Sequence, residues 1–125
     1  MIYEVRTYDL IPRTLPDFEK GVAEKLPDRL KYSPLGGWWY TEMGPLNQVV
    51  HVWPYDDGNH RTKIRGQAVS DGKWPPNTGQ FILNMNTEIF LPAPFMTPLG
   101  ERNIGPIYEM RTYTYAPNQI PKVLD

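Results

Sequence analysis

Residues 2–8 read Ile-Tyr-Glu-Val-Arg-Thr-Tyr, and residues 107–113 read Ile-Tyr-Glu-Met-Arg-Thr-Tyr. The match continues at the same offset of 105 residues, for example from Pro12 to Pro117. This period is far longer than the roughly 20 to 50 residues of solenoid repeats. The repeated unit is therefore expected to be a whole small domain rather than a stacking element.

The repeat divides the chain into three predicted parts. With 125 residues, the chain has the length of one ordinary domain. We expect a complete unit over residues 1–99 and a connector with glycine, proline and asparagine over 100–106. Residues 107–125 would then be the first strand and the helix start of a second, truncated unit.

Composition excludes several classes of function. Thirteen basic and 14 acidic residues give a net charge of -1, so no strong field is available to attract nucleic acid. Without cysteine and with two histidines, a metal site is not expected, and no glycine-rich nucleotide motif points to a cofactor. No apolar run approaches the roughly 18 residues of a membrane span. Since no targeting signal is recognised either, we predict a cytoplasmic protein without membrane partners.

The first two elements follow from residue periodicity. Alternating β-branched and aromatic residues predict a strand over 2–10. A helix should begin after Thr14, which forms an expected capping box with Asp17. Its buried face is predicted from an apolar stripe at helical spacing: Leu15, Phe18, Val22, Leu26 and Leu30.

The remaining elements complete a βαββαβ order. Two strands, over 36–43 and 48–53, should form a hairpin, followed by a polar helix over 58–70 and a strand over 80–91. This order predicts a ferredoxin-like α+β unit, in which an antiparallel sheet carries both helices on one face. The other face would be bare and apolar, which favours a homodimer formed through the sheet. Strand 107–115 is expected to pair with a sheet edge, by exchange with another chain or within its own.

Three segments of the chain resemble a known protein family. Residues 44–53, Gly-Pro-Leu-Asn-Gln-Val-Val-His-Val-Trp, closely resemble the NIPSNAP family, as do Tyr3-Glu-Val-Arg-Thr-Tyr8 and Leu91-Pro-Ala-Pro-Phe95. The resemblance covers about residues 1–99, and residues 74–79 depart from the family pattern. It implies a dimeric α+β barrel assembled sheet to sheet, and it implies no defined biochemical activity.

His51 is the leading candidate for a functional side chain, and the only candidate catalytic residue. It shares a strand face with Val49 and Trp53, where burial would lower its pKa and keep the imidazole neutral. A neutral imidazole could serve as a general base or bind a ligand. The alternative is that the ring only satisfies a buried partner, which the residues alone favour.

A binding pocket is predicted between the sheet and the helices. Arg6 could hold a carboxylate in its planar fork. However, Glu109 and Arg111 repeat the pair formed by Glu4 and Arg6, which favours a structural role for that pair. The expected lining combines aromatic area with a few polar groups: Arg6, Tyr8, His51, Trp53 and Asn84.

Three functions remain open from the sequence. The first is a binder of a small apolar molecule in this pocket. The second is a cofactor-independent monooxygenase, which rests on fold analogy alone. The third is a structural or adaptor module that acts through its sheet face.

Overall fold

The computed structural model describes residues 1–124. Its elements follow the predicted βαββαβ order, with a short 3-10 helix before the last strand and a short helix near the C-terminus. They are β1 (Ile2–Leu10), α1 (Leu15–Arg29), β2 (Gly37–Tyr40), β3 (Gln48–Tyr55), α2 (Gly58–Ser70), η1 (Gly79–Phe81), β4 (Ile82–Phe90) and α3 (Ile120–Leu124).

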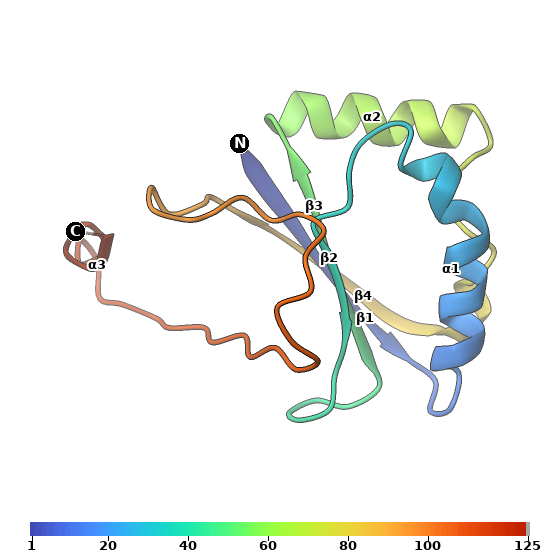
Figure 1. The fold of residues 1–125 in the computed structure, drawn as a ribbon, viewed down its shortest axis with the longest axis horizontal. Coiled ribbons are helices and arrows are strands. Elements are labelled where there is room, and N and C mark those ends of the chain that lie inside the picture. Colours follow the sequence, from blue (N-terminus) through green and yellow to red (C-terminus); the bar gives the residue numbers. More distant parts are fainter. Residues whose placement is uncertain (125) are drawn as a thin grey trace.

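The four strands form one antiparallel sheet in the order β2-β3-β1-β4. Helices α1 and α2 lie on the same side of this sheet, and the C-terminal residues run along the other side (Figure 1). The ferredoxin-like α+β architecture is therefore confirmed. Strand β1 lies at the centre, so its helix-facing side chains are the most enclosed.

Helix α1 packs through part of its predicted stripe. Phe18 and Val22 are buried against the sheet, but Leu30 is 43% exposed, and its neighbour Arg29 is buried instead. The predicted capping box is wrong, because the Thr14 hydroxyl donates to the Ile11 carbonyl rather than accepting from the helix.

Helix α2 has the predicted bounds, and Asp57 caps it by accepting a hydrogen bond from the His60 N–H at 2.8 Å. Its buried residue is Ala68, and most of its remaining surface is polar. An almost entirely polar helix gains little from apolar burial. The residues that α2 turns toward the sheet are therefore of special interest.

The β2–β3 hairpin is shorter on its first strand than predicted. Asn47 in the connecting turn has a φ of 59°, a left-handed conformation that asparagine tolerates well. Adjacent residues Trp38 and Trp39 face opposite sides of the sheet. The Trp38 ring stacks on Phe18 of α1, whereas the Trp39 ring lies 5.6 Å from that of Tyr108 on the other side.

The C-terminal segment repeats the turn that precedes α1. Arg13 and Asn118, which are 105 residues apart, have φ angles of 71° and 64°. Each turn is closed by a backbone hydrogen bond of 3.2 Å, from Thr14 to Ile11 and from Gln119 to Ala116. Helix α3 then begins at the position that corresponds to the start of α1. The turns before α1 and α3 therefore share one backbone geometry.

Residues 107–115 form no strand and are exposed. The predicted pairing of this segment with a sheet edge of its own chain is therefore wrong. The segment lies instead along the face of the sheet opposite the helices, where the Tyr108 ring packs near the Trp39 ring, so its backbone does not reach a sheet edge. Exchange with another chain stays a prediction.

Candidate functional site

The site lies between the sheet and the two helices. Side chains on a strand alternate between its two faces, so Glu4, Arg6 and Tyr8 of β1 all face the helices. The antiparallel register places Arg6 opposite His51 and Glu4 opposite Trp53 on β3. Four of the five predicted lining residues are therefore gathered on one face: Arg6, Tyr8, His51 and Trp53.

His51 is enclosed by aromatic rings. The side chains of Tyr8 and Trp38 place their ring centroids 4.8 and 5.1 Å from the imidazole. The residue is 3% exposed. Burial lowers the pKa of His51 to about 3, and the positive charges of Arg6 and Arg65 contribute to this lowering. The imidazole is therefore neutral near pH 7, as predicted.

The proton position on His51 follows from its one hydrogen bond. The Trp53 indole N–H donates to Nδ1 of His51 at 2.8 Å. An indole nitrogen can only donate, so Nδ1 must be the acceptor of the neutral ring and Nε2 must carry the hydrogen. The Nε2 atom is buried and has no hydrogen-bond partner. The site thus contains an unused buried donor.

Glu4 organises the centre of β1. Its Oε2 atom accepts hydrogen bonds from Arg6, Arg61 and Thr87 at 3.0, 2.7 and 2.7 Å. Burial alone would raise the pKa of this carboxyl, but the bonds from Arg61 and Thr87 and the charge of Arg6 outweigh it, and the pKa falls to about 2. Glu4 therefore stays ionised and neutralises part of the positive charge beside it.

The ion pair between Glu4 and Arg6 occurs twice. Glu109 and Arg111 form the same pair at 2.7 Å in the exposed C-terminal segment. Arg6 also donates to the Tyr8 hydroxyl at 2.9 Å. The pair forms as the sequence indicated, and its first copy is buried.

Arg29 is a buried cation that the sequence did not point to. It is 1% exposed, and its guanidinium lies 4.4 Å from the centroid of the Trp53 ring. It donates to the hydroxyls of Tyr55 and Ser33, both at 2.7 Å. Both acceptors are neutral. Its Nε atom is buried without a partner.

Helix α2 supplies two further arginines. Arg61 and Arg65 are one turn apart and so lie on the same side of the helix as Ala68. Arg61 reaches Glu4 on the sheet, which fixes this side of α2 toward the site. The sequence offered one signal for these residues: positions 61, 65 and 68 have the spacing of a buried helix face, although two of them are charged.

Asn84 is the one predicted lining residue that lies elsewhere. It pairs with Asp9 across the β1–β4 ladder, and its side-chain amide donates to the Asp9 carboxylate at 3.3 Å. Asp9 alternates with Tyr8 along β1, so Asn84 belongs to the face away from the helices. The register is regular from the Tyr3–Phe90 pair to the Asp9–Asn84 pair, so the face of Asn84 follows from its pairing with Asp9.

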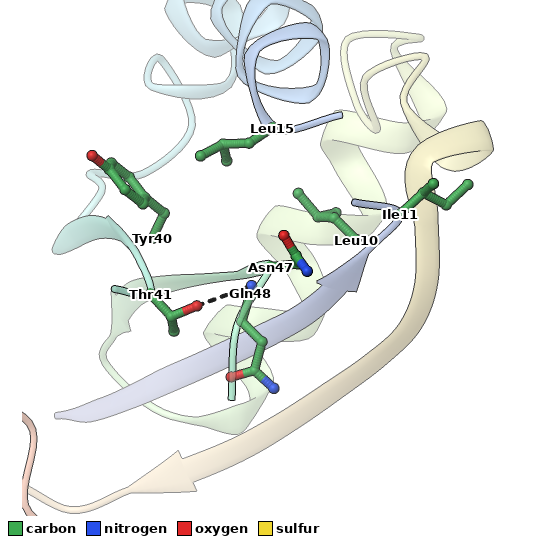
Figure 2. Close-up of a pocket in the computed structure, with 7 residues that line it drawn as sticks. All are labelled: Leu10, Ile11, Leu15, Tyr40, Thr41, Asn47 and Gln48. Atoms are coloured by element: carbon green, nitrogen blue, oxygen red, sulfur yellow. Dashed lines mark hydrogen bonds between the residues drawn. The ribbon is translucent and has the colours of Figure 1, made fainter. Parts of the chain in front are cut away.

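A pocket of about 190 Å³ opens at one end of the same layer. Figure 2 shows Leu15 of α1 and Tyr40 of β2 above the hairpin residues Thr41 and Gln48. Leu10 in its wall belongs to an apolar cluster, and Leu15, Tyr8 and Trp38 pack against that cluster. The Tyr8 and Trp38 rings, which contact His51, therefore adjoin the same cluster as the pocket without lining the pocket itself.

The described residues contain neither a group suited to hold a metal ion nor a helix suited to span a membrane. Within residues 1–124, no three histidine or acidic side chains are close enough together to hold a metal ion. The same part of the chain contains no helix with the length and apolarity needed to cross a membrane. The groups around His51 are arginines, aromatic rings, the Glu4 carboxylate and the Glu19 carboxylate, which accepts a hydrogen bond from the Trp38 indole at 2.7 Å.

The family model of NIPSNAP matches residues 3–97, which include β1 to β4 and every residue of the site. The chain belongs to the NIPSNAP family. Protein NipSnap homolog 3B of Mus musculus is 31% identical over 121 residues, which are 92% of this chain and 48% of that protein. The NipSnap homolog of Dictyostelium discoideum is 36% identical over 90 residues, 69% of this chain and 39% of that protein. The chain therefore spans about half the length, or less, of these NIPSNAP relatives.

Solved structures agree with the NIPSNAP fold. A NIPSNAP domain protein from Burkholderia xenovorans superposes with a TM-score of 0.73 at 31% identity, covering 78% of this chain and 99% of that one. It is described as uncharacterised, so the likeness brings no reaction with it. A protein from Nitrosomonas europaea, named among the antibiotic biosynthesis monooxygenases, gives a TM-score of 0.59 at 7% identity, covering 74% of this chain and 98% of that one. At that identity, the likeness shows the fold alone.

Proposed function

We propose that the layer between the sheet and the helices binds a small, largely apolar molecule through an oxygen atom of that molecule. One observation carries this proposal: the Nε2–H donor of His51 is buried among aromatic rings and has no partner. Leaving a buried polar group without a hydrogen bond costs about 1 to 3 kcal/mol. A ligand that supplies an acceptor oxygen would recover this cost.

The pocket at Leu15 and Tyr40 supports the proposal from the apolar side. Leu10 in its wall belongs to the apolar cluster against which the rings around His51 pack. The apolar part of the ligand would lie in this pocket, and a turn of the Tyr8 or Trp38 ring would bring its oxygen to Nε2. A volume of about 190 Å³ is below the roughly 300 to 1,000 Å³ of sites for drug-sized ligands. The ligand is therefore expected to be small.

The geometry favours binding over general base catalysis. A base must offer a free lone pair to the proton that it removes. In His51 the Nδ1 lone pair is occupied by the Trp53 N–H, and Nε2 carries the hydrogen. Its low pKa makes the imidazole a weak base as well. His51 is therefore assigned as a donor to the ligand, and the monooxygenase alternative draws no support from it.

Native mass spectrometry of the purified protein tests this function. We expect a small molecule to be retained by the wild-type chain and lost in His51→Phe, which keeps a ring but removes the donor. His60→Phe is the matched control, because His60 lies on α2 and its side chain is 33% exposed. A wild-type spectrum without any retained molecule, together with no change in melting temperature in a screen of small oxygen-bearing aromatics, would contradict the proposal.

We also propose that two copies associate through the sheet face opposite the helices. This face carries large side chains, including Trp39 and Phe90, and the C-terminal segment touches it at two places. In an assembly, residues 107–115 of one copy could add to a sheet edge of the other. Light scattering would give the mass of the assembly, and Trp39→Asp should reduce it to one chain. A monomeric wild-type mass would contradict this proposal.

A further inference from the structure

The pocket at Leu15 and Tyr40 is lined by both apolar and neutral polar side chains. The apolar part comes from the end of β1 and the start of α1, and the polar part comes from the β2–β3 hairpin (Figure 2). The lining residues are Leu10, Ile11, Leu15, Tyr40, Thr41, Asn47 and Gln48. None of these seven is an aspartate, glutamate, histidine, lysine or arginine. The hairpin residues therefore determine which polar group of a ligand the pocket accepts.

The charged groups around the pocket do not favour an anion inside it. The Asp9 carboxylate accepts a hydrogen bond from the Gln48 side chain, and the Glu19 carboxylate accepts one from the Trp38 indole, both at 2.7 Å. Arg13, in the turn before α1, is exposed and is not a lining residue. A charged group that leaves water without a partner of opposite charge pays a large desolvation cost. The polar group that enters this pocket is therefore expected to be neutral.

The Asn47 carboxamide is the unused polar group of the pocket wall. The Gln48 side chain is occupied by its carboxylate partner, and the Thr41 hydroxyl oxygen accepts from the Gln48 backbone N–H at 3.1 Å. The Tyr40 hydroxyl points away from the other lining residues (Figure 2). The Asn47 backbone carbonyl accepts from the Leu10 N–H at 2.8 Å, but the Asn47 carboxamide forms no hydrogen bond with the other residues drawn.

The backbone of the hairpin turn does not require this carboxamide. Asn47 has a φ of 59°, in the left-handed region that glycine adopts most readily. Gly44 of the same turn has a φ of 76°. A glycine at position 47 would therefore meet the demands of the turn. The asparagine adds a donor and an acceptor at the pocket, which the hairpin itself leaves free.

We infer that the ligand carries a neutral carboxamide, which pairs with the Asn47 carboxamide at the mouth of the pocket. The inference rests on the proposed function and specifies a second polar group of the ligand, apart from the oxygen that reaches His51. A carboxamide presents a donor and an acceptor side by side, so two such groups can form two hydrogen bonds. A ketone or a carboxylate offers acceptors only and can form one of the two. Asn47 is exposed, so the pair would form where the ligand enters.

Three compounds of nearly the same shape separate these possibilities. Benzamide offers a donor and an acceptor, acetophenone offers one neutral acceptor, and benzoate offers a charged acceptor. Titrations of the full chain followed by ¹H–¹⁵N NMR measure each affinity, and shifts of the Leu10 and Gln48 amide signals report binding at this pocket. Benzamide should bind at least about fivefold tighter than either of the others, because one neutral hydrogen bond contributes about 1 kcal/mol.

Glycine variants assign this preference to Asn47. Asn47→Gly keeps the left-handed backbone and removes the carboxamide, so the variant should bind benzamide and acetophenone equally. Its melting temperature should not fall below that of the wild-type chain, because glycine adopts this φ without strain. Asn118→Gly is the matched control, since Asn118 has a φ of 64° in the C-terminal turn and does not line the pocket. This variant should bind all three compounds like the wild-type chain.

The failures of the two proposals are distinguishable. Equal binding of benzamide and acetophenone by the wild-type chain, tighter binding of benzoate, or a preference for benzamide that survives in Asn47→Gly would overturn the carboxamide inference. None of these results contradicts ligand binding at His51, which the mass spectra of the wild-type chain and His51→Phe decide. Absence of binding by all three compounds would overturn the carboxamide inference, and together with a wild-type chain that retains no small molecule it would overturn both proposals.

Discussion

The Trp53 indole N–H and Nδ1 of His51 are 2.8 Å apart within the buried layer of the domain. Because the indole only donates, the neutral imidazole carries its hydrogen on Nε2. In ¹⁵N-edited NMR spectra at pH 7, we expect the nitrogen shifts of the Nε2–H tautomer for His51. Trp53→Phe removes the donor and should allow both tautomers. A wild-type spectrum with the hydrogen on Nδ1 would contradict the donor assignment.

The lowered pKa of His51 predicts how stability depends on pH. Its folded-state pKa is about 3, compared with 6.5 for an unperturbed histidine. At pH values between these two, His51 is protonated in the unfolded chain but not in the folded one. The contribution of His51 to the free energy of unfolding is therefore fully present above pH 6.5 and falls as the pH decreases. From pH 7 to pH 5, this group should lower the free energy of unfolding by about 2 kcal/mol.

Urea denaturation at pH 7 and pH 5 measures this effect. The wild-type chain should lose about 2 kcal/mol more than His51→Asn over the same interval. The comparison with the variant removes the contributions of the other titrating groups. Equal losses in the two proteins would show that His51 is not held neutral by the fold.

The two copies of the Glu-Arg pair offer a matched test of burial. Glu4→Gln removes the buried negative charge to which three side chains donate hydrogen bonds. We therefore expect a loss of about 3 to 5 kcal/mol in the free energy of unfolding. Glu109→Gln alters the exposed copy, whose side chains are more than 60% exposed. That loss should not exceed about 1 kcal/mol. Losses of similar size would contradict the structural role of Glu4.

Gly21 and Gly66 predict opposite effects of one substitution. A Cβ on Gly21 of α1 would meet the methyl carbon of buried Thr78, and such overpacking costs about 1 to 3 kcal/mol. A Cβ on Gly66 of α2 has open space around it. Gly66→Ala should therefore gain about 0.5 to 1 kcal/mol from helix propensity. Thermal unfolding followed by circular dichroism would show whether the two melting temperatures shift in opposite directions.

The C-terminal segment should contribute little to the stability of the domain. Its contact with the sheet includes the ring pair of Trp39 and Tyr108, and such pairs contribute about 0.5 to 1.5 kcal/mol beyond area burial. Deletion of residues 100–125 should therefore lower the free energy of unfolding by about 1 kcal/mol, and Tyr108→Ala should account for most of this. Loss of the cooperative transition on deletion would show that the segment is part of the core.

The fold was largely predictable from the sequence, because its elements have strong local signals. The alternation over 2–10 and the turn chemistry around 44–47 define the strands, and Asp57 caps α2 where the sequence places it. The failures are also local. The Thr14 hydroxyl donates to the Ile11 carbonyl and accepts no hydrogen bond from a helix N–H.

The site was predicted in part. Side chains two residues apart on a strand lie on the same face of the sheet. This alternation along β1 and β3 correctly groups Arg6 and Tyr8 with His51 and Trp53. It fails for Asn84, whose face depends on its pairing with Asp9, and the pattern of neither strand encodes that pairing. The arginines of the helices were missed because a charged residue on a helix is normally expected to face solvent.

Arg29 shows why this expectation fails here. Its burial depends on the faces of Trp53 and Trp74, which approach it from β3 and from the loop after α2. An arginine surrounded by aromatic faces and hydroxyls is stable inside a protein for reasons that only three-dimensional neighbours supply. By contrast, the spacing of Arg61 and Arg65 on α2 was visible in the sequence.

The turn at residues 116–119 reproduces the one at 11–14, with a left-handed residue at the corresponding position and the same closing bond. The first turn is attached to a finished sheet, whereas the second follows an exposed chain. The geometry must therefore be written into the tetrapeptide itself. A corner that forms in both settings needs no neighbouring sheet to hold its shape.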